Sequence, residues 1–317
     1  MRHPAVASTA CLAVSLLWPA AAAPSPHGPR VRFPRDHYGH RAGIEWWYVS
    51  GDVRGSDGRR YSVFFTLFAR GGLVLVVSQV VDLDSGRLVG HSERVGAAEV
   101  GATRLAVRLA SDASLAYRPG ANRWSAAARS GSYRLSFAAV PVKPYVLHGD
   151  GGVIRQGPSR SFYYSATRMR MRGALADAGR RVGFTGAAWL DHQWGNFAAV
   201  PQALRWDWFS CRFDDGSELM LYRFRDGVRD GTFVERSGAG SPVPSFQATA
   251  GQRILTAAGR RWPLDWVLSV SSPRLRLRLR SLARDQLVRG RLLPTFWEGA
   301  AAAAGTKTGV CFVEETS

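Results

Sequence analysis

Tryptophans beside acidic residues are the feature of this sequence with the clearest chemical meaning. The chain has 11 tryptophans. A carboxyl group among indole rings is poorly solvated, so its pKa rises and it can stay protonated near neutral pH, as a general acid must. The alternative is structural, because such an acid can simply accept hydrogen bonds from indole N–H groups. Four motifs have this composition: Glu45-Trp46-Trp47-Tyr48, Trp189-Leu190-Asp191-His192-Gln193-Trp194, Trp206-Asp207-Trp208 and Trp297-Glu298.

Asp207 is the candidate general acid. It alternates with Trp206 and Trp208, so both rings lie on the strand face opposite the carboxyl group. If the Asp face lines a cavity, loss of hydration keeps Asp207 neutral. If the Trp face lines it instead, Asp207 points to an arginine such as Arg205 or Arg212 and is a structural anchor. The sequence leaves both alternatives open.

Several common catalytic and cofactor motifs are absent. The sequence has no G-x-S-x-G, S-x-x-K or H-E-x-x-H, and no P-loop or dinucleotide fingerprint. His37 and His40 have a spacing typical of metal ligands, but a metal site needs further ligands that the fold must supply. None is evident, so we predict no metal and no cofactor.

The N-terminus has the features of a secretory signal peptide. Arg2 and His3 precede an uncharged stretch that ends in small residues, with an A-x-A type cleavage site near Ala23. We therefore assign residues 1–23 to a signal peptide and expect a periplasmic or secreted protein. No other stretch reaches the roughly 20 apolar residues of a membrane-spanning helix.

The charge is strongly positive, at +18, but its distribution argues against nucleic acid. Of the 42 basic residues only Lys143 and Lys307 are lysines. The arginines are spread along the chain and form no basic tail or block. We therefore predict no nucleic-acid partner. Peripheral contact with an anionic membrane surface is an expected by-product of the charge.

Alternation with a period of two dominates the sequence and predicts β-strands. The clearest run, Arg274–Arg280, places four arginines on one face, which we expect to be solvated, and three leucines on the other. Turn signals such as Asp84-Ser85-Gly86 and Asp214-Asp215-Gly216 separate many strand-like runs, which is typical of antiparallel hairpins. No sustained helical period occurs. The pattern breaks around residues 195–203, where we place a domain boundary.

The order and content of the motifs resemble the AttH-like family, whose best-known enzyme is carotenoid 1,2-hydratase (hydroxyneurosporene synthase). The resemblance implies an all-β fold of two lipocalin-like antiparallel β-barrel domains, which we assign to residues 30–198 and 199–317. It also implies a pocket for an extended apolar ligand. The motifs that carry it are Phe33-Pro34-Arg35-Asp36-His37, Glu45-Trp46-Trp47-Tyr48-Val49-Ser50-Gly51, Tyr163-Tyr164-Ser165, Gly186–Gly195, Trp206-Asp207-Trp208-Phe209-Ser210 and Phe296-Trp297-Glu298-Gly299.

The leading functional hypothesis is hydratase-type acid–base chemistry on an isoprenoid or lipid-like ligand. A buried acid protonates an alkene, the faces of Trp194 and Trp206 stabilise the cation, and His192 orients the attacking water. The resemblance implies His192 and Trp194 directly, and Tyr222 as the tyrosine. The expected catalytic residues are Asp207, His192 and Tyr222, and the expected ligand-binding residues are Glu45, Trp47, Tyr164, Asp191, Trp194 and Trp206. We expect Trp47, Asp191, His192, Trp194 and Asp207 around a single cavity.

Two other functions remain open at this level. A lipocalin-like carrier needs only the cavity, because small barrels hold one apolar ligand without catalysis. A secreted hydrolase would need a water-activating pair of His192 and an Asp. We expect a monomer whose partner is a hydrophobic small molecule. Cys211 and Cys311 either form a disulfide, which export permits, or remain buried thiols.

Overall fold

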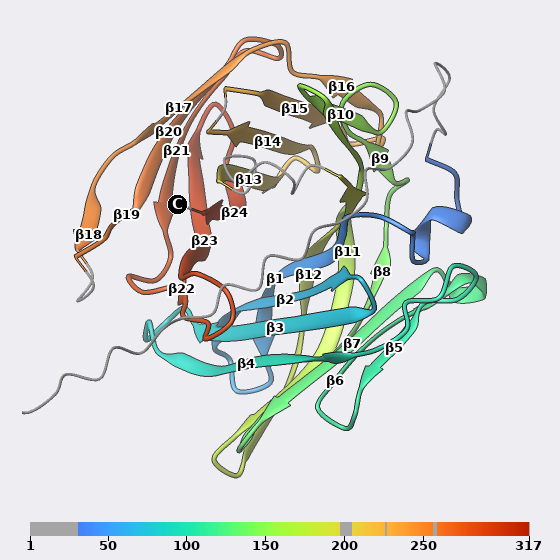
Figure 1. The fold of residues 1–317 in the computed structure, drawn as a ribbon. Helices are drawn as coiled ribbons and strands as arrows, with labels where there is room; N and C mark the ends of the chain where they lie inside the picture. The colour runs from blue at the N-terminus through green and yellow to red at the C-terminus, as the bar shows by residue number, and fades with distance from the viewer. Residues whose placement is uncertain (1–30, 197–204, 226, 256–258, 317) are drawn as a thin grey trace, which may run out of the picture.

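Two large antiparallel β-sheets and a small two-stranded one make up the described part of the chain (Figure 1). The computed structural model describes residues 31–196, 205–225, 227–255 and 259–316. The predicted signal peptide lies outside these residues. The all-β fold class with two packed barrel domains is confirmed, and helix is limited to two 3-10 turns in the described residues, η1 (Arg35–His37) and η2 (Pro119–Ala121). No helix among them is long and apolar enough to cross a membrane.

The first sheet forms a nearly closed barrel. Its order is β4-β3-β2-β1-β12-β11-β8-β7-β6-β5, with β9 and β10 also paired to β11. Side chains of β4 bridge to the far end of the sheet, where Ser92 donates to the Arg129 carbonyl at 3.0 Å and Arg94 pairs with Asp112 at 3.1 Å. The strands are β1 (Ile44–Gly55), β2 (Arg60–Arg70), β3 (Leu73–Asp82), β4 (Leu88–Ala97), β5 (Ala106–Leu109), β6 (Ala113–Arg118), β7 (Arg123–Ser130), β8 (Tyr133–Pro141), β9 (Val146–Leu147), β10 (Val153–Gln156), β11 (Ser159–Asp177) and β12 (Arg180–Gly195).

The second sheet is a half-barrel. Its order is β16-β15-β14-β13-β24-β23-β21-β20-β17, with β22 paired to β23, and β18 and β19 form a separate hairpin. The strands are β13 (Trp206–Phe213), β14 (Glu218–Phe224), β15 (Arg229–Val234), β16 (Gly240–Pro242), β17 (Phe246–Ala250), β18 (Arg253–Leu255), β19 (Arg261–Pro263), β20 (Asp265–Val270), β21 (Leu275–Ser281), β22 (Leu287–Val288), β23 (Phe296–Gly305) and β24 (Gly309–Glu315).

The alternation in the arginine-rich run behaves as predicted. On β21, Leu275, Leu277 and Leu279 are buried in the second sheet's core. Arg274 precedes the strand and is exposed, as are Arg276, Arg278 and Arg280. The prediction that these four arginines face solvent is confirmed.

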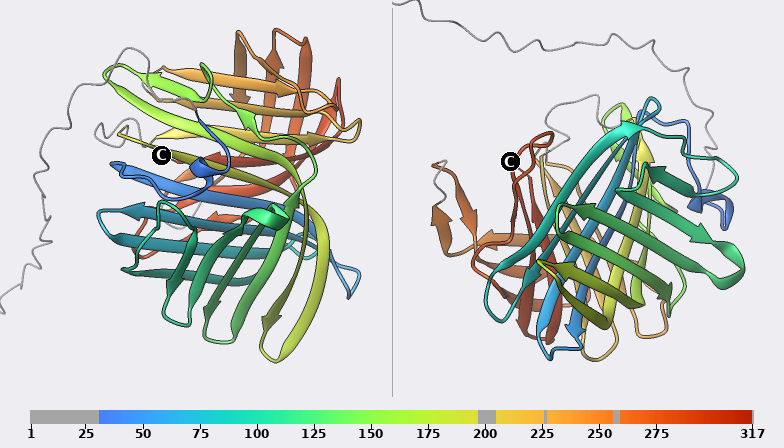
Figure 2. Two further views of the ribbon diagram at one scale, coloured as in Figure 1. Left: turned by 90° about the vertical axis from the view of Figure 1, so that its right-hand side faces the viewer. Right: turned by 90° about the horizontal axis from the view of Figure 1, so that it is seen from below.

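Three apolar cores result from the alternation. One fills the first barrel and one lines the concave face of the second sheet. The third lies between the sheets and is rich in aromatic residues, among them Trp46, Tyr48, Trp189, Trp208 and Tyr222. Figure 2 shows the two sheets packed against each other in two further views. Strands β13 and β14, the part of β1 up to Gly51 and the part of β12 from Ala188 on therefore have no solvated face, since each contributes to a barrel core and to the layer between the sheets.

A disulfide joins the neighbouring strands β13 and β24. Cys211 and Cys311 are register partners, are completely buried in the core of the second sheet, and are bonded to each other. Of the two alternatives left open by the sequence, the structure therefore has the disulfide.

Removal of this disulfide should destabilise the second domain. The bond closes a sequence separation of 100 residues, and loss of a native disulfide typically costs about 2–5 kcal/mol. A Cys211→Ala/Cys311→Ala double variant should show this loss in its free energy of unfolding in guanidinium titrations. Dithiothreitol should lower the stability of the wild type and leave the double variant unchanged. Equal stability of the oxidised wild type and the double variant would contradict the assignment.

Candidate functional site

The paired strands β1 and β12 divide the predicted site residues between two places. Trp47 pairs with His192, and Tyr48 pairs with Asp191 on the next position. Successive side chains of a strand point to opposite faces. Trp47 and Trp194 therefore belong to the first barrel's core, whereas Tyr48 belongs to the core between the sheets. The prediction of a single cavity that holds Trp47, Asp191, His192, Trp194 and Asp207 is wrong.

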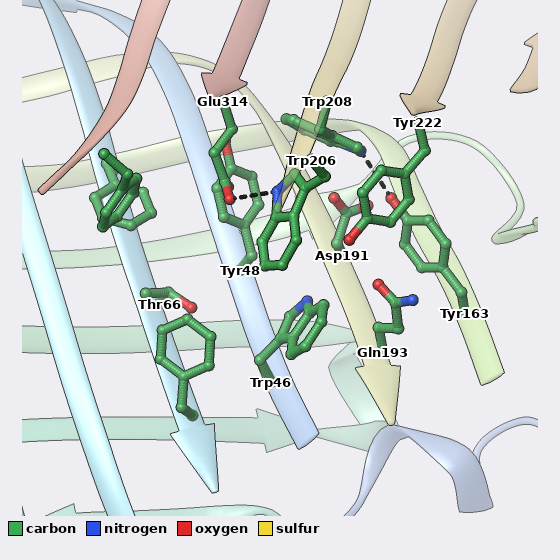
Figure 3. A pocket seen from close by; sticks show the side chains of 13 residues that line it. Trp46, Tyr48, Thr66, Tyr163, Asp191, Gln193, Trp206, Trp208, Tyr222 and Glu314 are labelled. Atoms are coloured by element: carbon green, nitrogen blue, oxygen red, sulfur yellow. Dashed lines mark hydrogen bonds between the residues drawn. The ribbon is translucent and has the colours of Figure 1, made fainter. Parts of the chain in front are cut away.

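A narrow pocket lies between the two sheets and holds Asp191, Tyr222 and Trp206 of the predicted set. Its volume is about 40 Å³, which has room for a few water molecules, since one needs at least about 10–15 Å³. We call it the interdomain pocket (Figure 3). It is lined by Trp46, Tyr48, Phe64, Thr66, Phe68, Tyr163, Asp191, Gln193, Trp206, Trp208, Tyr222, Phe296 and Glu314.

A wider apolar groove adjoins this pocket and has a volume of about 450 Å³. The groove and the pocket share Trp46, Phe68, Trp206, Phe296 and Glu314, so the two lie on either side of these side chains. Leu73 and Val95, which also line the groove, are more than half exposed. An elongated apolar molecule could enter here with one end directed at the pocket.

Asp191 is the best-placed acid in the interdomain pocket. It is 4% exposed and accepts hydrogen bonds from the Trp189 indole at 2.6 Å and from the Ser165 hydroxyl. Burial raises its pKa to about 7, although these hydrogen bonds favour the charged form. Asp191 is therefore divided between its acid and carboxylate forms near neutral pH.

A buried chain of hydrogen bonds leads to Asp191 from the second sheet. His148 is fully buried and keeps a neutral ring, since burial lowers its pKa to about 3. Its Nε2 lies 2.6 Å from the Ser165 hydroxyl, and its Nδ1 lies 2.9 Å from the hydroxyl of Thr232 on β15. Because Ser165 donates to Asp191, it must accept from His148 Nε2–H. Thr232 then donates to Nδ1, and all three hydrogen bonds point toward Asp191.

Two tyrosines flank Asp191. Figure 3 shows the side chains of Asp191, Tyr163 and Tyr222 turned toward one another. The Tyr163 hydroxyl accepts a hydrogen bond from the Trp208 indole at 3.0 Å, and its proximity favours the charged form of Asp191. Burial raises the pKa of both tyrosines well above the usual value, so both hydroxyls carry a proton. The pocket thus offers hydroxyl donors beside a protonatable carboxyl group.

Two further glutamates lie where the pocket meets the groove, since Glu314 lines both and Glu298 is its neighbour on the next strand. Glu298 and Glu314 are register partners on β23 and β24. The Tyr48 hydroxyl donates to Glu298 at 2.7 Å, and the Trp206 indole donates to Glu314 at 2.7 Å. Burial raises the pKa of Glu314 to about 7, and burial plus the nearby Glu314 charge raises the pKa of Glu298 well above its usual value. This pair therefore holds at least one proton at neutral pH.

Asp207 does not belong to the pocket. It is completely buried on the opposite face of β13, where Arg223 donates to it at 2.9 Å through Nε and Arg225 donates at 2.9 Å. The prediction of Asp207 as the general acid is wrong, because Trp206 and Trp208 take the pocket face. The anchor alternative is the one observed, although its arginines are Arg223 and Arg225 rather than Arg205 or Arg212.

The remaining predicted residues gather at the mouth of the first barrel, in a set that we call the barrel-mouth cluster. It consists of Asp36, His37, His40, Glu45, Trp47, Tyr164, His192 and Trp194. Glu45 Oε1 lies 2.7 Å from both His40 Nδ1 and His192 Nε2. The carboxylate partners and hydrogen bonds of His40 outweigh its burial and raise its pKa, whereas burial lowers the pKa of His192.

His192 therefore cannot orient water beside Asp191, since the strand separates them. Its partners among the described residues are Glu45, the Tyr164 hydroxyl at 3.1 Å and the Asp36 carbonyl at 3.0 Å. The carboxylate partner of His192 is therefore Glu45, and its contact with Asp36 is with the backbone carbonyl. The pair of His192 and an Asp that the hydrolase hypothesis names is not formed among the described residues.

Sequence reasoning missed several residues in and around the pocket. Tyr48, Tyr163, Gln193 and Glu314 line it, and Ser165, His148 and Glu298 lie behind the lining residues. Most of them lie within the quoted motifs, one position away from residues that were chosen. The two-residue alternation of the strands could have identified some of them, because every second side chain of a strand points to the same face. Trp46 and Tyr48 share such a face with Asp191 and Gln193. Glu314 and His148 carried no such signal, since only the fold brings them to the pocket.

A family model described as AttH-like matches residues 24–317. The chain belongs to the AttH-like family. The resemblance drawn from the motifs is thereby confirmed. No curated protein is significantly similar to the chain in sequence.

Two crystal structures are similar to the whole fold. One, from Nitrosomonas europaea and described as an AttH, is 25% identical, covers 93% of this chain and 99% of its own, and superposes with a TM-score of 0.84. The other is kievitone hydratase from Nectria haematococca, which is 18% identical, covers 91% of this chain and 94% of its own, and has a TM-score of 0.77. The fold is thus a lipocalin-like one that a hydratase also has.

The anchoring role of Asp207 predicts a loss of stability without a specific effect on the pocket. Breaking a buried ion pair leaves uncompensated charge and costs about 3–5 kcal/mol. Asp207→Asn should therefore lower the free energy of unfolding by about 3 kcal/mol in urea titrations. Asp285→Asn is the matched control, since its pair with Arg289 is half exposed and should contribute at most about 1 kcal/mol. Equal effects of the two substitutions would refute the anchor.

Glu314 should make the stability depend on pH in a defined direction. Its pKa is about 7 in the folded protein and about 4.3 in the unfolded chain. At pH values between these two pKa values, Glu314 keeps a proton in the folded state that it has lost in the unfolded state. The free energy of unfolding therefore falls as pH rises. The glutamine side chain of a Glu314→Gln variant cannot ionise. Relative to the wild type, this variant should therefore gain about 2–3 kcal/mol between pH 4.5 and 8.

Urea titrations at a series of pH values would measure this difference. Asp285→Asn serves again as the control, because the pKa of Asp285 is lowered and its contribution changes only at more acidic pH. A difference between wild type and Glu314→Gln that stays constant over this range would show that Glu314 ionises normally.

Proposed function

We propose that this protein is a hydratase-type hydro-lyase that acts on an extended apolar substrate, with Asp191 as the general acid. The observation that carries the proposal is a carboxyl group with a pKa of about 7 in a water-sized pocket that adjoins an apolar groove. Family membership supports it, and the fold shared with kievitone hydratase is compatible with it. The substrate class is isoprenoid or lipid-like, because the groove offers mainly apolar and aromatic walls.

The proposed reaction adds water across an isolated double bond. Asp191 in its acid form transfers its proton to one alkene carbon, and a cation develops on the other. The indole rings of Trp46, Trp206 and Trp208 line the pocket, and aromatic faces attract cations. A water molecule forms the new C–O bond and gives up a proton to the Asp191 carboxylate, which restores the acid. The reverse sequence is dehydration.

The other pocket residues have roles that follow from their hydrogen bonds. The chain from Thr232 through His148 and Ser165 fixes the orientation of Asp191. The hydroxyls of Tyr163 and Tyr222 are protonated donors that can hold the attacking water. Glu314 stands where the groove meets the pocket, so its partly protonated carboxyl group can bind a polar end of the substrate.

A carrier without turnover is the second candidate function. The groove alone supports it, since a volume of about 450 Å³ is in the range of small-molecule sites. Acid residues in the pocket would then serve only to bind a polar end of the cargo. In both cases we propose an exported monomer that takes its ligand from a periplasmic or secreted pool.

Native purification followed by extraction and mass spectrometry would identify the bound molecule. That molecule, and its hydrated or dehydrated counterpart, would then be incubated with enzyme in H₂¹⁸O. The hydratase proposal predicts ¹⁸O in the alcohol product with the wild type. Asp191→Asn should reduce turnover by about 10²–10⁴-fold, the usual contribution of a general acid, while ligand affinity is nearly kept.

The control for this experiment is Asp285→Asn, whose carboxyl group lies on an exposed ion pair and should not affect turnover. Thermal denaturation of each variant separates a loss of chemistry from a loss of fold. Retained turnover in a folded Asp191→Asn protein would remove Asp191 from the mechanism. A tightly bound ligand that the wild type never converts in either direction would establish the carrier.

A further inference from the structure

We propose that the barrel-mouth cluster is a binding site for a divalent transition-metal ion such as Zn²⁺, with His40, Glu45 and His192 as its ligands. The sequence-based expectation of no metal considered only His37 and His40. The fold leaves His37 outside the ligand set and supplies Glu45 from β1 and His192 from β12.

The three candidate ligand atoms converge on one point. One ring nitrogen of each histidine and a carboxylate oxygen of Glu45 all lie within 4.8 Å of one another. Both ring nitrogens are 2.7 Å from Glu45 Oε1. Bonds from Zn²⁺ to nitrogen and oxygen are about 2.0–2.2 Å long, so tetrahedral donors lie roughly 3.3–3.6 Å apart. Each nitrogen therefore has to move away from Glu45 Oε1 by roughly 0.6–0.9 Å to accommodate the ion.

The outer hydrogen bonds allow both histidines to turn a lone pair toward this point. His192 Nδ1 faces the Asp36 carbonyl at 3.0 Å and the Tyr164 oxygen at 3.1 Å. The carbonyl and Glu45 can both only accept, and a neutral His192 that donates from Nδ1 to the carbonyl directs its Nε2 lone pair at Glu45, as metal binding requires. Tyr164 is free to accept, because its own proton can go to His37 Nδ1 at 2.7 Å.

His40 has the same arrangement. Its Nε2 lies 3.4 Å from the Asp36 carboxylate, which also can only accept, and its Nδ1 faces Glu45. Asp36 thus orients both histidines, one through its side chain and one through its backbone. Metal-bound histidines usually donate their second N–H to a carboxylate or a carbonyl in this way.

Without an ion, each histidine must donate to Glu45 instead, and it can then donate to Asp36 as well only if its ring is cationic. His192 is completely buried, and Glu45 is 2% exposed. A divalent cation satisfies all three acceptors with neutral rings. Imidazole and carboxylate donors without thiolate suit Zn²⁺ and neighbouring first-row ions better than Mg²⁺ or Ca²⁺, which prefer oxygen.

The surroundings hold the ligands in place and leave an entrance. Trp47 stacks on His192 with ring centroids 4.3 Å apart, and Trp194 stacks on His40 with centroids 4.0 Å apart. The His40 side chain is 17% exposed, which gives an ion access from solvent. Such a site would tie the segment before β1 to the β1–β12 pair, whose opposite face carries Asp191, so we assign it a structural role.

Metal content and stability of the purified wild type test this inference independently of any catalytic activity. After treatment with EDTA and dialysis against micromolar Zn²⁺, the protein should retain one zinc per chain. Saturating Zn²⁺ should raise the melting temperature of the EDTA-treated protein by about 5 °C or more. Co²⁺ in place of Zn²⁺ should give visible ligand-field absorption typical of nitrogen and oxygen donors.

His40→Ala is the test variant, since His40 lies at the edge of the cluster and its loss is the least disruptive to the fold. It should lose the bound zinc and the temperature shift. His91→Ala is the matched control, because His91 is a half-buried histidine of β4 outside the cluster, and it should keep both. A wild type that binds no zinc, or zinc that persists in His40→Ala, would show that the cluster is only a proton-sharing network.

Discussion

The two-residue alternation of β1 and β12 is the constraint on which the rest of the structure depends. From Glu45 to Gly51 and from Ala188 to Trp194 both strands are covered on both faces, so every side chain of this stretch lies either in the first barrel or in the layer between the sheets. A shift of one residue in register would exchange the two sets completely. Asp191 and His192 are adjacent in sequence, yet they serve different sites for this reason.

The buried acids of the pocket differ from the buried acids that anchor the fold in the kind of partner they have. Asp207 and Glu218 are completely buried, but Asp207 has Arg223 and Arg225 as partners, and Glu218 has Arg168 at 2.6 Å and Lys143 at 2.8 Å. In the described part of the chain, Asp191 and Glu314 are held by hydroxyl and indole donors instead. Loss of hydration is therefore not offset, and their pKa values rise.

Strand content and the solvated arginine face could be predicted from the sequence, because period-two patterning reports directly on burial. The family, and through it the two-barrel architecture, could be recognised from the tryptophan-rich motifs. The composition of the site could not be predicted in the same way. The sequence shows which residues of a strand share a face, but it does not say which face of Trp206-Asp207-Trp208 meets the other domain. That choice depends on how the two sheets pack.

Contacts between residues far apart in the sequence could not be predicted either. Glu314 reaches the pocket by pairing with Glu298, and His148 reaches Asp191 through Ser165. The pairing of Cys211 with Cys311 has the same origin, since it follows from the register of β13 and β24. None of these contacts has a local pattern in the sequence.

The most direct test of the account is the ionisation state of Asp191 itself. Infrared difference spectra of wild type against Asp191→Asn, recorded from pH 5 to pH 9, would follow the C=O band of its protonated carboxyl group. The account predicts that this band is present at pH 5, falls to half near pH 7 and is replaced by carboxylate absorption above it. A carboxylate already present at pH 5 would contradict the account, because Asp191 could then not supply the proton that the proposed reaction needs.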